Sequence, residues 1–376
     1  MISSRDQFNH LSLREAREAR GLSLAELAAK TDVTRQAISL FENGKKPPGV
    51  ETLARIAREL KFPVNYFLTT PERPALKGVI NFRKLGSATK RDRIKSTIRE
   101  RWTADLVKLL AESVNLPKVN LPDFGVVDFD QLSDDEIDDY AQETRRFWGL
   151  GLGPISNLTL LLENNGVVVS RINLSTAVDA FSCWQEDVPI ILLGNKLPFA
   201  RGRFDCGHEL AHLILHKAVS DEHQSDPETF KLIEKQAHKF GAALLVPREA
   251  LAKELYSTSL ESFISLKKRW GLSVQALVYR AASLGLISQN QSQYLFRQIS
   301  GLGYRKVEPL DKETPAERPS LLPRAVRLLV ENNILQGHDF IEELNLFPED
   351  LSEITGIEPA FFQDSLRVAP IALRRA

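Results

Sequence analysis

The most constraining feature of this chain is the sequence His-Glu-Leu-Ala-His at residues 208–212. On an α-helix, residues four apart lie on one face, so His208 and His212 can direct two imidazoles at one metal ion. Glu209 then lies beside the open coordination position, where its carboxylate can take a proton from a zinc-bound water. The motif therefore requires a helix here and predicts a zinc site. Because so short a pattern also arises by chance, the rest of the chain must supply a third ligand.

Five of the seven histidines lie within 31 residues, at positions 208, 212, 216, 223 and 238. A catalytic zinc site takes three protein ligands and leaves the fourth position open. The spacing leaves five candidates for the third ligand: His216, His223, Asp226, Glu234 and His238. His216 is about 80° round the helix from His208, which favours a role at the helix end. Glu234 and His238 are four residues apart on the next predicted helix, so both can face the motif helix.

The net charge of zero conceals an uneven distribution. Residues 1–118 contain 23 Lys and Arg against 13 Asp and Glu, whereas residues 119–376 contain 26 against 36. A basic segment joined to an acidic one suggests a module that binds a polyanion, attached to a domain with another role. A patterned surface without a partner is the alternative. At 376 residues the chain is too long for one ordinary core, so two or three domains are expected.

The apolar residues and the cysteines indicate the compartment. No run approaches 18 consecutive apolar residues, and the start MISSRDQFNH lacks a signal-peptide core, so we expect a cytoplasmic protein without a membrane partner. The two cysteines, Cys183 and Cys206, fit a reducing compartment. Cys206 precedes His208 by two residues, but nothing nearby activates its thiol. We expect it to be a small buried residue rather than a redox switch.

Capping residues and glycines divide residues 11–68 into five short predicted helices. The first ends at Gly21, Ser23 and Glu26 form a capping box for the second, and Thr34 opens the third. The fourth carries apolar residues at helical spacing after the Lys-Lys-Pro-Pro turn, and a short turn at 66–68 follows. The pattern predicts a small, basic, all-helical domain.

This stretch, LREAREARGLSLAELAAKTDVTRQAISLFENGKKPPGVETLARIARELKF, resembles the XRE-type (Cro/repressor-like) helix-turn-helix domain. In that geometry the third helix enters the major groove of double-stranded DNA. The resemblance implies that operator DNA is contacted by Thr34, Arg35, Gln36, Ser39, Lys45 and Lys46. Arg and Gln side chains can read guanine and adenine, whereas the two lysines would contact phosphates. A bundle used only for protein contacts is the alternative. Such domains usually bind as dimers, so a homodimer is among the expected states.

The remaining chain alternates predicted helices with a few strands. A proline-containing connector leads to a long basic helix at about 89–114, and an acidic helix opened by Ser133 ends near residue 148. A helix at about 154–164 and apolar runs at 166–172, 180–184 and 189–193 predict a small sheet. The motif helix at about 201–217 and a helix at 228–245 follow, and 249–300 is helical. Residues 301–323 are rich in turns, and the tail carries short amphipathic helices.

Residues 233–247, IEKQAHKFGAALLVP, resemble the second signature of the ImmA/IrrE-type metallopeptidases. In that family the leading Glu completes a His-His-Glu site for Zn²⁺, which implies His208, His212 and Glu234 as ligands and Glu209 as the catalytic residue. For His238 three roles stay open: contact with a ligand residue, a hydrogen bond to substrate and, least favoured, ligation. The resemblance extends to 149–154, Trp184, Pro189, 303–304 and 308–309. Gly241 replaces an expected Ala, a change that should only loosen the helix slightly.

The family resemblance also implies the chemistry, which is metal-assisted hydrolysis of an amide. Zinc would polarise the scissile carbonyl, while Glu209 accepts a proton and passes it to the leaving amine. The substrate would lie extended along an edge strand, for which residues 167–172 and 181–184 are candidates. Arg201, Arg203 and Tyr256 are candidates for stabilising the oxyanion.

We therefore predict an α+β, mostly α chain in four parts. Residues 1–70 form the helix-turn-helix domain and 71–122 a basic helical linker. Residues 123–300 form a zincin-like ImmA/IrrE-type peptidase domain with a small sheet, and 301–376 form a helical C-terminal extension. We expect the tail after about residue 325 to pack as a cap on the peptidase domain, with a small interaction or sensing module as the alternative.

The function that the resemblance implies is a DNA-binding transcriptional regulator with a zinc-dependent endopeptidase. It would cleave a cognate repressor protein, or its own chain, to derepress stress or mobile-element genes. The alternative is a repressor or antitoxin-like DNA-binding protein whose zinc site is structural or sensory. Retention of Glu209 favours the enzyme, since a structural site needs no base.

Overall fold

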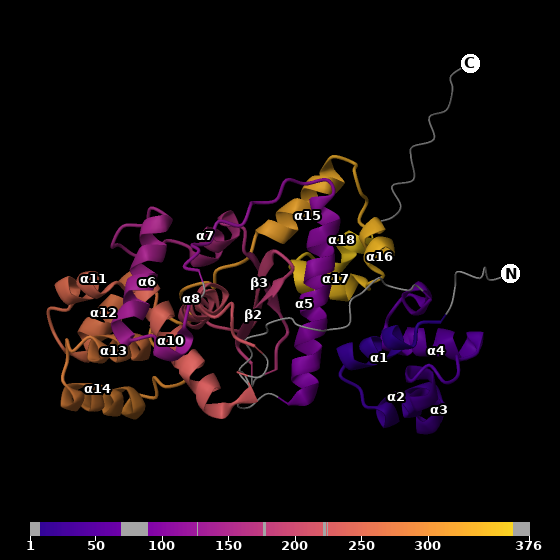
Figure 1. Cartoon of the computed structure of the whole chain (residues 1–376), viewed down its shortest axis with the longest axis horizontal. Helices are drawn as coiled ribbons and strands as arrows, with labels where there is room; N and C mark the ends of the chain where they lie inside the picture. The colour runs from indigo at the N-terminus through magenta and orange to yellow at the C-terminus, as the bar shows by residue number, and fades with distance from the viewer. Residues whose placement is uncertain are drawn as a thin grey trace, which may run out of the picture. The chain divides into compact units, whose positions relative to one another are not determined.

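The computed structural model describes residues 8–68, 89–125, 127–175, 178–220, 223 and 225–363. It is mostly helical with one small sheet, which confirms the predicted fold class (Figure 1). The chain divides into two compact units. The first comprises the described parts of 1–77, 88–116 and 322–376, and the second comprises those of 117–321. Residues 69–88, which include the first part of the predicted linker, lie outside the described residues.

The first unit begins with four helices and a short 3-10 helix. They are α1 (His10–Ala19), α2 (Leu24–Thr31), α3 (Arg35–Glu42), α4 (Val50–Leu60) and a 3-10 turn (Val64–Phe67). Ser23 and Glu26 form the predicted capping box, and Thr34 Oγ1 accepts a hydrogen bond from the Ala37 amide. Arg17 on α1 donates two hydrogen bonds to Glu42 on α3, at 2.6 and 2.8 Å, and both residues are buried. This bidentate ion pair fixes the orientation of α3.

The same unit includes α5 (Lys90–Ala111) and the C-terminal helices. These are α15 (Leu321–Glu331), α16 (Asp339–Leu344), α17 (Pro348–Thr355) and α18 (Pro359–Gln363). At the end of α1, Arg20 donates to Asp350 of α17 at 2.6 Å. Arg99 of α5 donates to the Ala19 carbonyl at 2.8 Å and pairs with Glu353 at 3.3 Å. The tail from residue 322 therefore packs with α1 and α5 in the first unit, so the expectation that it caps the predicted peptidase domain is wrong, whereas the described residues 301–321 belong to the second unit.

The second unit is built on a three-stranded sheet of order β1-β3-β2. Its strands are β1 (Val168–Ile172), β2 (Ala180–Gln185) and β3 (Val188–Gly194). β1 lies parallel to β3, and β2 lies antiparallel to it with Ser182 opposite Ile191. Residues 189–194 of the central strand are buried, as expected for a strand covered on both faces. The sheet predicted from the apolar runs is therefore present, and in the described part of the chain β1 and β2 are its outer strands.

Helices α7 (Leu158–Asn164) and α8 (Phe199–Leu215) pack on this sheet, α10 (Pro227–Leu245) packs on α8, and α6 (Asp134–Phe147) packs on α10. The long apolar region after α10 forms α11 (Arg248–Glu254), α12 (Leu260–Trp270), α13 (Val274–Ser283) and α14 (Gln289–Gly301). Figure 1 shows α11 to α14 gathered beside α6 and α10. Their apolar faces close one continuous core with α8 and α10. Within the described residues, none of the helices combines the length and the apolar character needed to cross a membrane.

Helices α8 and α10 approach each other most closely at two glycines. A methyl group placed on Gly241 would lie 2.9 Å from the backbone nitrogen of His208 and 3.0 Å from the carbonyl carbon of Gly207. Such distances are shorter than real Cβ contacts, and backbone atoms cannot rotate away as side-chain atoms can. Gly241 is therefore needed for the approach of the two helices, and the expectation that it only loosens α10 is wrong.

Candidate metal centre and DNA-binding face

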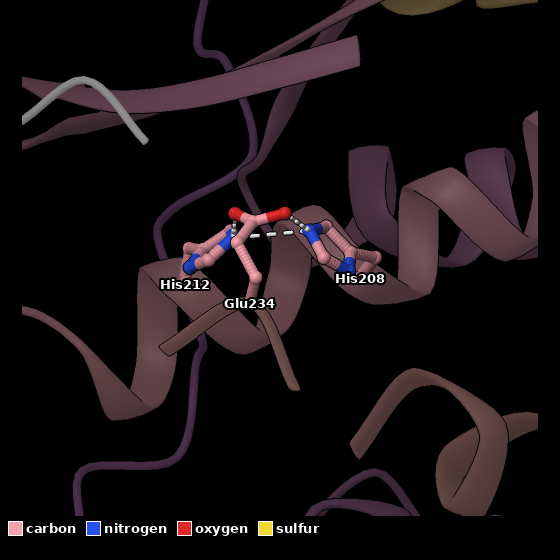
Figure 2. A group of neighbouring side chains, drawn as sticks. All are labelled: His208, His212 and Glu234. Atoms are coloured by element: carbon pink, nitrogen blue, oxygen red, sulfur yellow. Dashed lines mark hydrogen bonds and ion pairs between the residues drawn. The ribbon is translucent and has the colours of Figure 1, made fainter. Parts of the chain in front are cut away.

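His208, His212 and Glu234 bring three ligand atoms together between α8 and α10 (Figure 2). The Nε2 atoms of the two histidines are 3.1 Å apart, and they lie 3.6 and 3.3 Å from the two oxygens of Glu234. Three ligands at tetrahedral positions about 2.1 Å from one zinc ion are separated by about 3.4 Å. The trio is therefore spaced as a tetrahedral metal site requires, and two imidazoles with one carboxylate are a donor set that suits zinc.

Glu209 is held beside this trio by a serine on the edge strand. The hydroxyl of Ser182, on β2, donates to Oε2 of Glu209 at 2.7 Å, and both side chains are buried. Burial raises the pKa of Glu209 to about 8, against the opposing effects of His208 and of the Ser182 hydrogen bond. A nearby divalent cation shifts such a group back toward its carboxylate form. Glu209 is therefore oriented by a hydrogen bond and sensitive to charge placed at the trio.

A small niche opens on this group. It is lined by the trio members His208 and Glu234 and by Glu209, together with Asp179, Ala180, Arg201, Asp205 and His238. The niche has a volume of about 20 Å³, which is enough for one water molecule. Arg201 donates to Asp179 at 2.6 Å at its rim. The room beside Glu209 therefore suits a single water molecule.

A buried hydrogen-bond chain fixes the tautomer of His212. The amide nitrogen of Gln236 donates to the Phe129 carbonyl at 2.6 Å, so Oε1 of Gln236 must face Nε2 of His216, 3.0 Å away. Nε2 of His216 then carries the proton, and its Nδ1 accepts one from Nδ1 of His212 at 2.9 Å. Burial lowers the pKa of His212 to about 4 and that of His216 below its usual range. Nε2 of His212 is consequently unprotonated, and its lone pair faces the other two members of the trio, as metal ligation requires.

The other predicted candidates lie in different environments. His223 contacts Ser220 and Phe129, and Asp226 accepts the Thr229 amide at 2.8 Å as the cap of α10, so neither joins the trio. The ring of His238 packs 4.4 Å from that of His208, and its Nδ1 lies 2.8 Å from the Glu234 carbonyl. His238 therefore borders a trio residue without joining the group.

The three residues predicted as candidates for stabilising the oxyanion lie in different environments. Arg201 lines the niche, whereas Arg203 is buried against Glu317 at 2.5 Å and Tyr256 is 91% exposed on the surface. Glu317 also accepts the Leu158 and Thr159 amides at the start of α7, which gives Arg203 a structural role. Cys206 is fully buried and burial raises its pKa, as expected for a packing residue.

Sequence reasoning missed Ser182 and Gln236. Ser182 is a polar residue inside an apolar strand, and Gln236 lies at a buried position of α10 between Ile233 and Phe240. A polar side chain on a buried face must find a partner there, so both positions carried a signal. Their partners come from elements distant in sequence, which the local pattern does not reveal.

The predicted DNA-contacting residues lie on and after α3. Arg35 and Gln36 are exposed in its first turn, and Lys45 and Lys46 are exposed just after it. Thr34 is exposed and caps the helix, and Ser39 is half-buried. In the described part of the chain these side chains leave the N-terminal face of α3 open, as entry into a major groove requires.

The comparison with known families agrees with both regions. Residues 13–67 match the helix-turn-helix family model, and residues 162–282, which contain the whole trio, match the model of the IrrE N-terminal-like domain. The chain is a fusion of these two domains. The helix-turn-helix domain of the XRE type is thus a DNA-binding domain, and the IrrE-like domain is peptidase-like.

Two solved structures resemble the chain weakly. A transcriptional regulator of Mycobacterium tuberculosis is 14% identical with a TM-score of 0.31, and the match covers 48% of this chain and 51% of that one. The chain thus spans about half the length of that regulator. PlcR of Bacillus thuringiensis, solved with the peptide PapR7 and DNA, is 12% identical with a TM-score of 0.16 and coverage of 94% of each chain. No curated protein matches this chain.

Proposed function

We propose that this chain is a DNA-binding regulator whose IrrE-like domain is a zinc-dependent endopeptidase that cleaves a repressor protein or its own chain. The observation that supports the enzyme most is the placement of Glu209. It is buried beside the trio, is oriented by Ser182 and borders a niche with room for a water. A structural zinc site does not require a carboxylate beside the metal, because protein ligands fill all of its coordination positions.

Each residue of the site has a distinct role in the proposed reaction. His208, His212 and Glu234 would hold Zn²⁺, which supplies a Lewis acid for the scissile carbonyl and for the attacking water. Glu209 accepts the proton of the water and delivers it to the leaving amine, and Ser182 keeps its carboxylate aimed at the niche. The Gln236–His216 chain holds His212 in the tautomer that ligates.

Strand β2 lies next to the site. Extended peptides are commonly held along a strand by main-chain hydrogen bonds, and β2 itself pairs antiparallel with β3. Ser182, on this strand, contacts Glu209, whereas β1 is the edge on the opposite side of β3. Of the two edge strands predicted from sequence, β2 is therefore the one that we propose for substrate.

The DNA-binding role rests on the exposed end of α3. We propose that Arg35 and Gln36 read base edges, that Thr34 and Ser39 lie against the groove, and that Lys45 and Lys46 contact phosphates. The operator-bound form is proposed to be a homodimer, since such domains usually bind two half-sites.

A Glu209→Gln variant tests the peptidase. The change removes the base but keeps the shape of the side chain, so zinc content should match wild type while cleavage is lost. Cells that express each form are compared by mass spectrometry for proteins that persist uncleaved, and the purified chain is followed for self-cleavage. Glu249→Gln, an exposed position on α11, is the matched control. If the Glu209 variant cleaves as wild type does, or if wild type cleaves nothing that the variant spares, the peptidase proposal is wrong.

A further inference from the structure

A large cleft adjoins the catalytic niche in the IrrE-like domain. It has a volume of about 800 Å³ and shares Asp179, Arg201 and His238 with the niche. Its walls come from the start of α8, one face of α10, α13 and the turn at 304–306. Ligand pockets usually measure about 300–1,000 Å³, so the cleft is large enough for several residues of a peptide. The cleft therefore lies directly beside the niche that Glu209 borders.

The carboxylates that line the cleft are already neutralised by neighbouring cations. Asp134 pairs with Lys239 at 2.8 Å, and Asp179 pairs with Arg201 at 2.6 Å. Glu308 and Asp311 both pair with Lys267, at 2.8 and 2.5 Å. Glu308 also accepts the Val274 amide at the start of α13, so its charge is doubly satisfied. The acidic residues of the cleft therefore present little free negative charge.

The cations of the 304–306 turn are in a different situation. Arg305 and Lys306 line the cleft and are exposed, and within the described residues neither has a carboxylate within 4.0 Å. Arg305 donates only to the hydroxyl of Ser300, at 2.6 Å. Lys235, on the opposite wall, reaches Asp134 only at 4.0 Å. The cleft therefore carries an excess of positive charge at its rim.

Aromatic and aliphatic side chains line the same cleft as these cations. Tyr279 is 65% exposed and lies 4.6 Å from the ring of Phe296. Tyr304, Phe204 and Leu197 also line the cleft. Rigid aromatic rings left at a surface are characteristic of binding sites, because they bury a large area at little cost in conformational entropy.

We propose that this cleft binds the substrate segment beside the scissile bond and selects a segment with carboxylate side chains around a large apolar residue. The proposal rests on the proposed peptidase function. The apolar side chain would pack on Tyr279 and Tyr304, and the carboxylates would lie against Arg305 and Lys306. Charge complementarity at a rim of this kind discriminates between partners by suppressing the wrong sign.

The test measures binding without hydrolysis. The full-length Glu209→Gln variant is loaded with zinc, and its affinity for two fluorescein-labelled peptides of equal length is followed by fluorescence anisotropy. One peptide has Asp and Glu around a central Phe, and the other has Lys and Arg in those places. We expect the acidic peptide to bind at least about tenfold tighter at low salt, with the difference shrinking as salt is added.

Two variants locate the preference. In the same background, Arg305→Glu with Lys306→Glu should abolish or reverse the preference for the acidic peptide, whereas Lys253→Glu, exposed on α11 outside the cleft, should leave it unchanged. Tyr279→Ala should weaken the binding of both peptides and remove the discrimination between a central Phe and a central Ala.

Binding of the peptides to the basic helix-turn-helix domain is common to all variants, so the decisive quantity is the change in affinity on substitution. If the cleft variants leave the preference intact, or if the control alters it equally, the proposal is wrong. A separate result bears on the peptidase function. If wild type shows no cleavage in cells that depends on Glu209, while the cleft variants change peptide binding as expected, only the peptidase function is overturned.

Discussion

The contact between Gly241 and the backbone of α8 predicts an unusual result for Gly241→Ala. At an ordinary helix position this change stabilises by about 1 kcal/mol, because Gly is the poorer helix former. Here the new methyl group would lie 2.9 Å from the His208 nitrogen, so the two helices must separate by about 0.5 Å to reach an ordinary contact. Overpacking of this kind costs about 1–3 kcal/mol. Set against the gain of about 1 kcal/mol in helix propensity, this leaves a net loss of up to about 2 kcal/mol.

The same displacement acts on the metal site, because His208 and His212 lie on α8 and Glu234 lies on α10. Separating the helices moves the carboxylate away from the imidazoles, and we expect zinc affinity to fall by about tenfold or more. Zinc affinity is measured by competition with a chromophoric chelator, and stability by the melting transition that shifts with zinc. For a domain of this size the melting temperature should fall by up to about 8 °C.

Gly301→Ala is the matched control. Gly301 ends α14, and a methyl group built there meets nothing within 4 Å. This substitution should raise stability by up to about 1 kcal/mol and leave zinc binding unchanged. If Gly241→Ala also stabilises the domain and binds zinc as tightly as wild type, the close-approach argument is refuted.

Three further predictions follow from single contacts. Gln236→Leu should lower zinc affinity about tenfold and give mixed tautomers at His212 in ¹⁵N spectra; an unchanged Nδ1–H signal would contradict the hydrogen-bond chain. Glu317→Ala leaves a buried arginine and two amides unpaired and should cost about 3–5 kcal/mol in urea unfolding, and a loss below about 1 kcal/mol would be inconsistent with this. Replacing both Lys45 and Lys46 by Ala should reduce the salt dependence of promoter-DNA binding by about two in log–log slope; an unchanged slope would exclude phosphate contacts.

The elements themselves follow closely from local pattern. The capping boxes at Ser23 and Ser133 begin helices where predicted, and the apolar runs form the three strands. Such features depend on neighbours a few residues apart, so a single sequence carries them. The grouping of elements into units does not follow from local pattern. Helix α17 packs against the end of α1 through Asp350 and Arg20, which are 330 residues apart in the sequence.

The sequence by itself determined that His208 and His212 share one helix face, that Glu209 is their neighbour, and that a group of short capped helices precedes them, because helical periodicity and capping are local. The helix-turn-helix domain was recognised by family resemblance. Glu234 was selected by family resemblance, and the structure brings it within 3.3 Å of His212. Only the tertiary structure decided which strand edge faces Glu209, which hydrogen bonds fix His212, and why residue 241 is glycine. Each of these depends on atoms from elements distant in sequence, and close packing alone sets their separation.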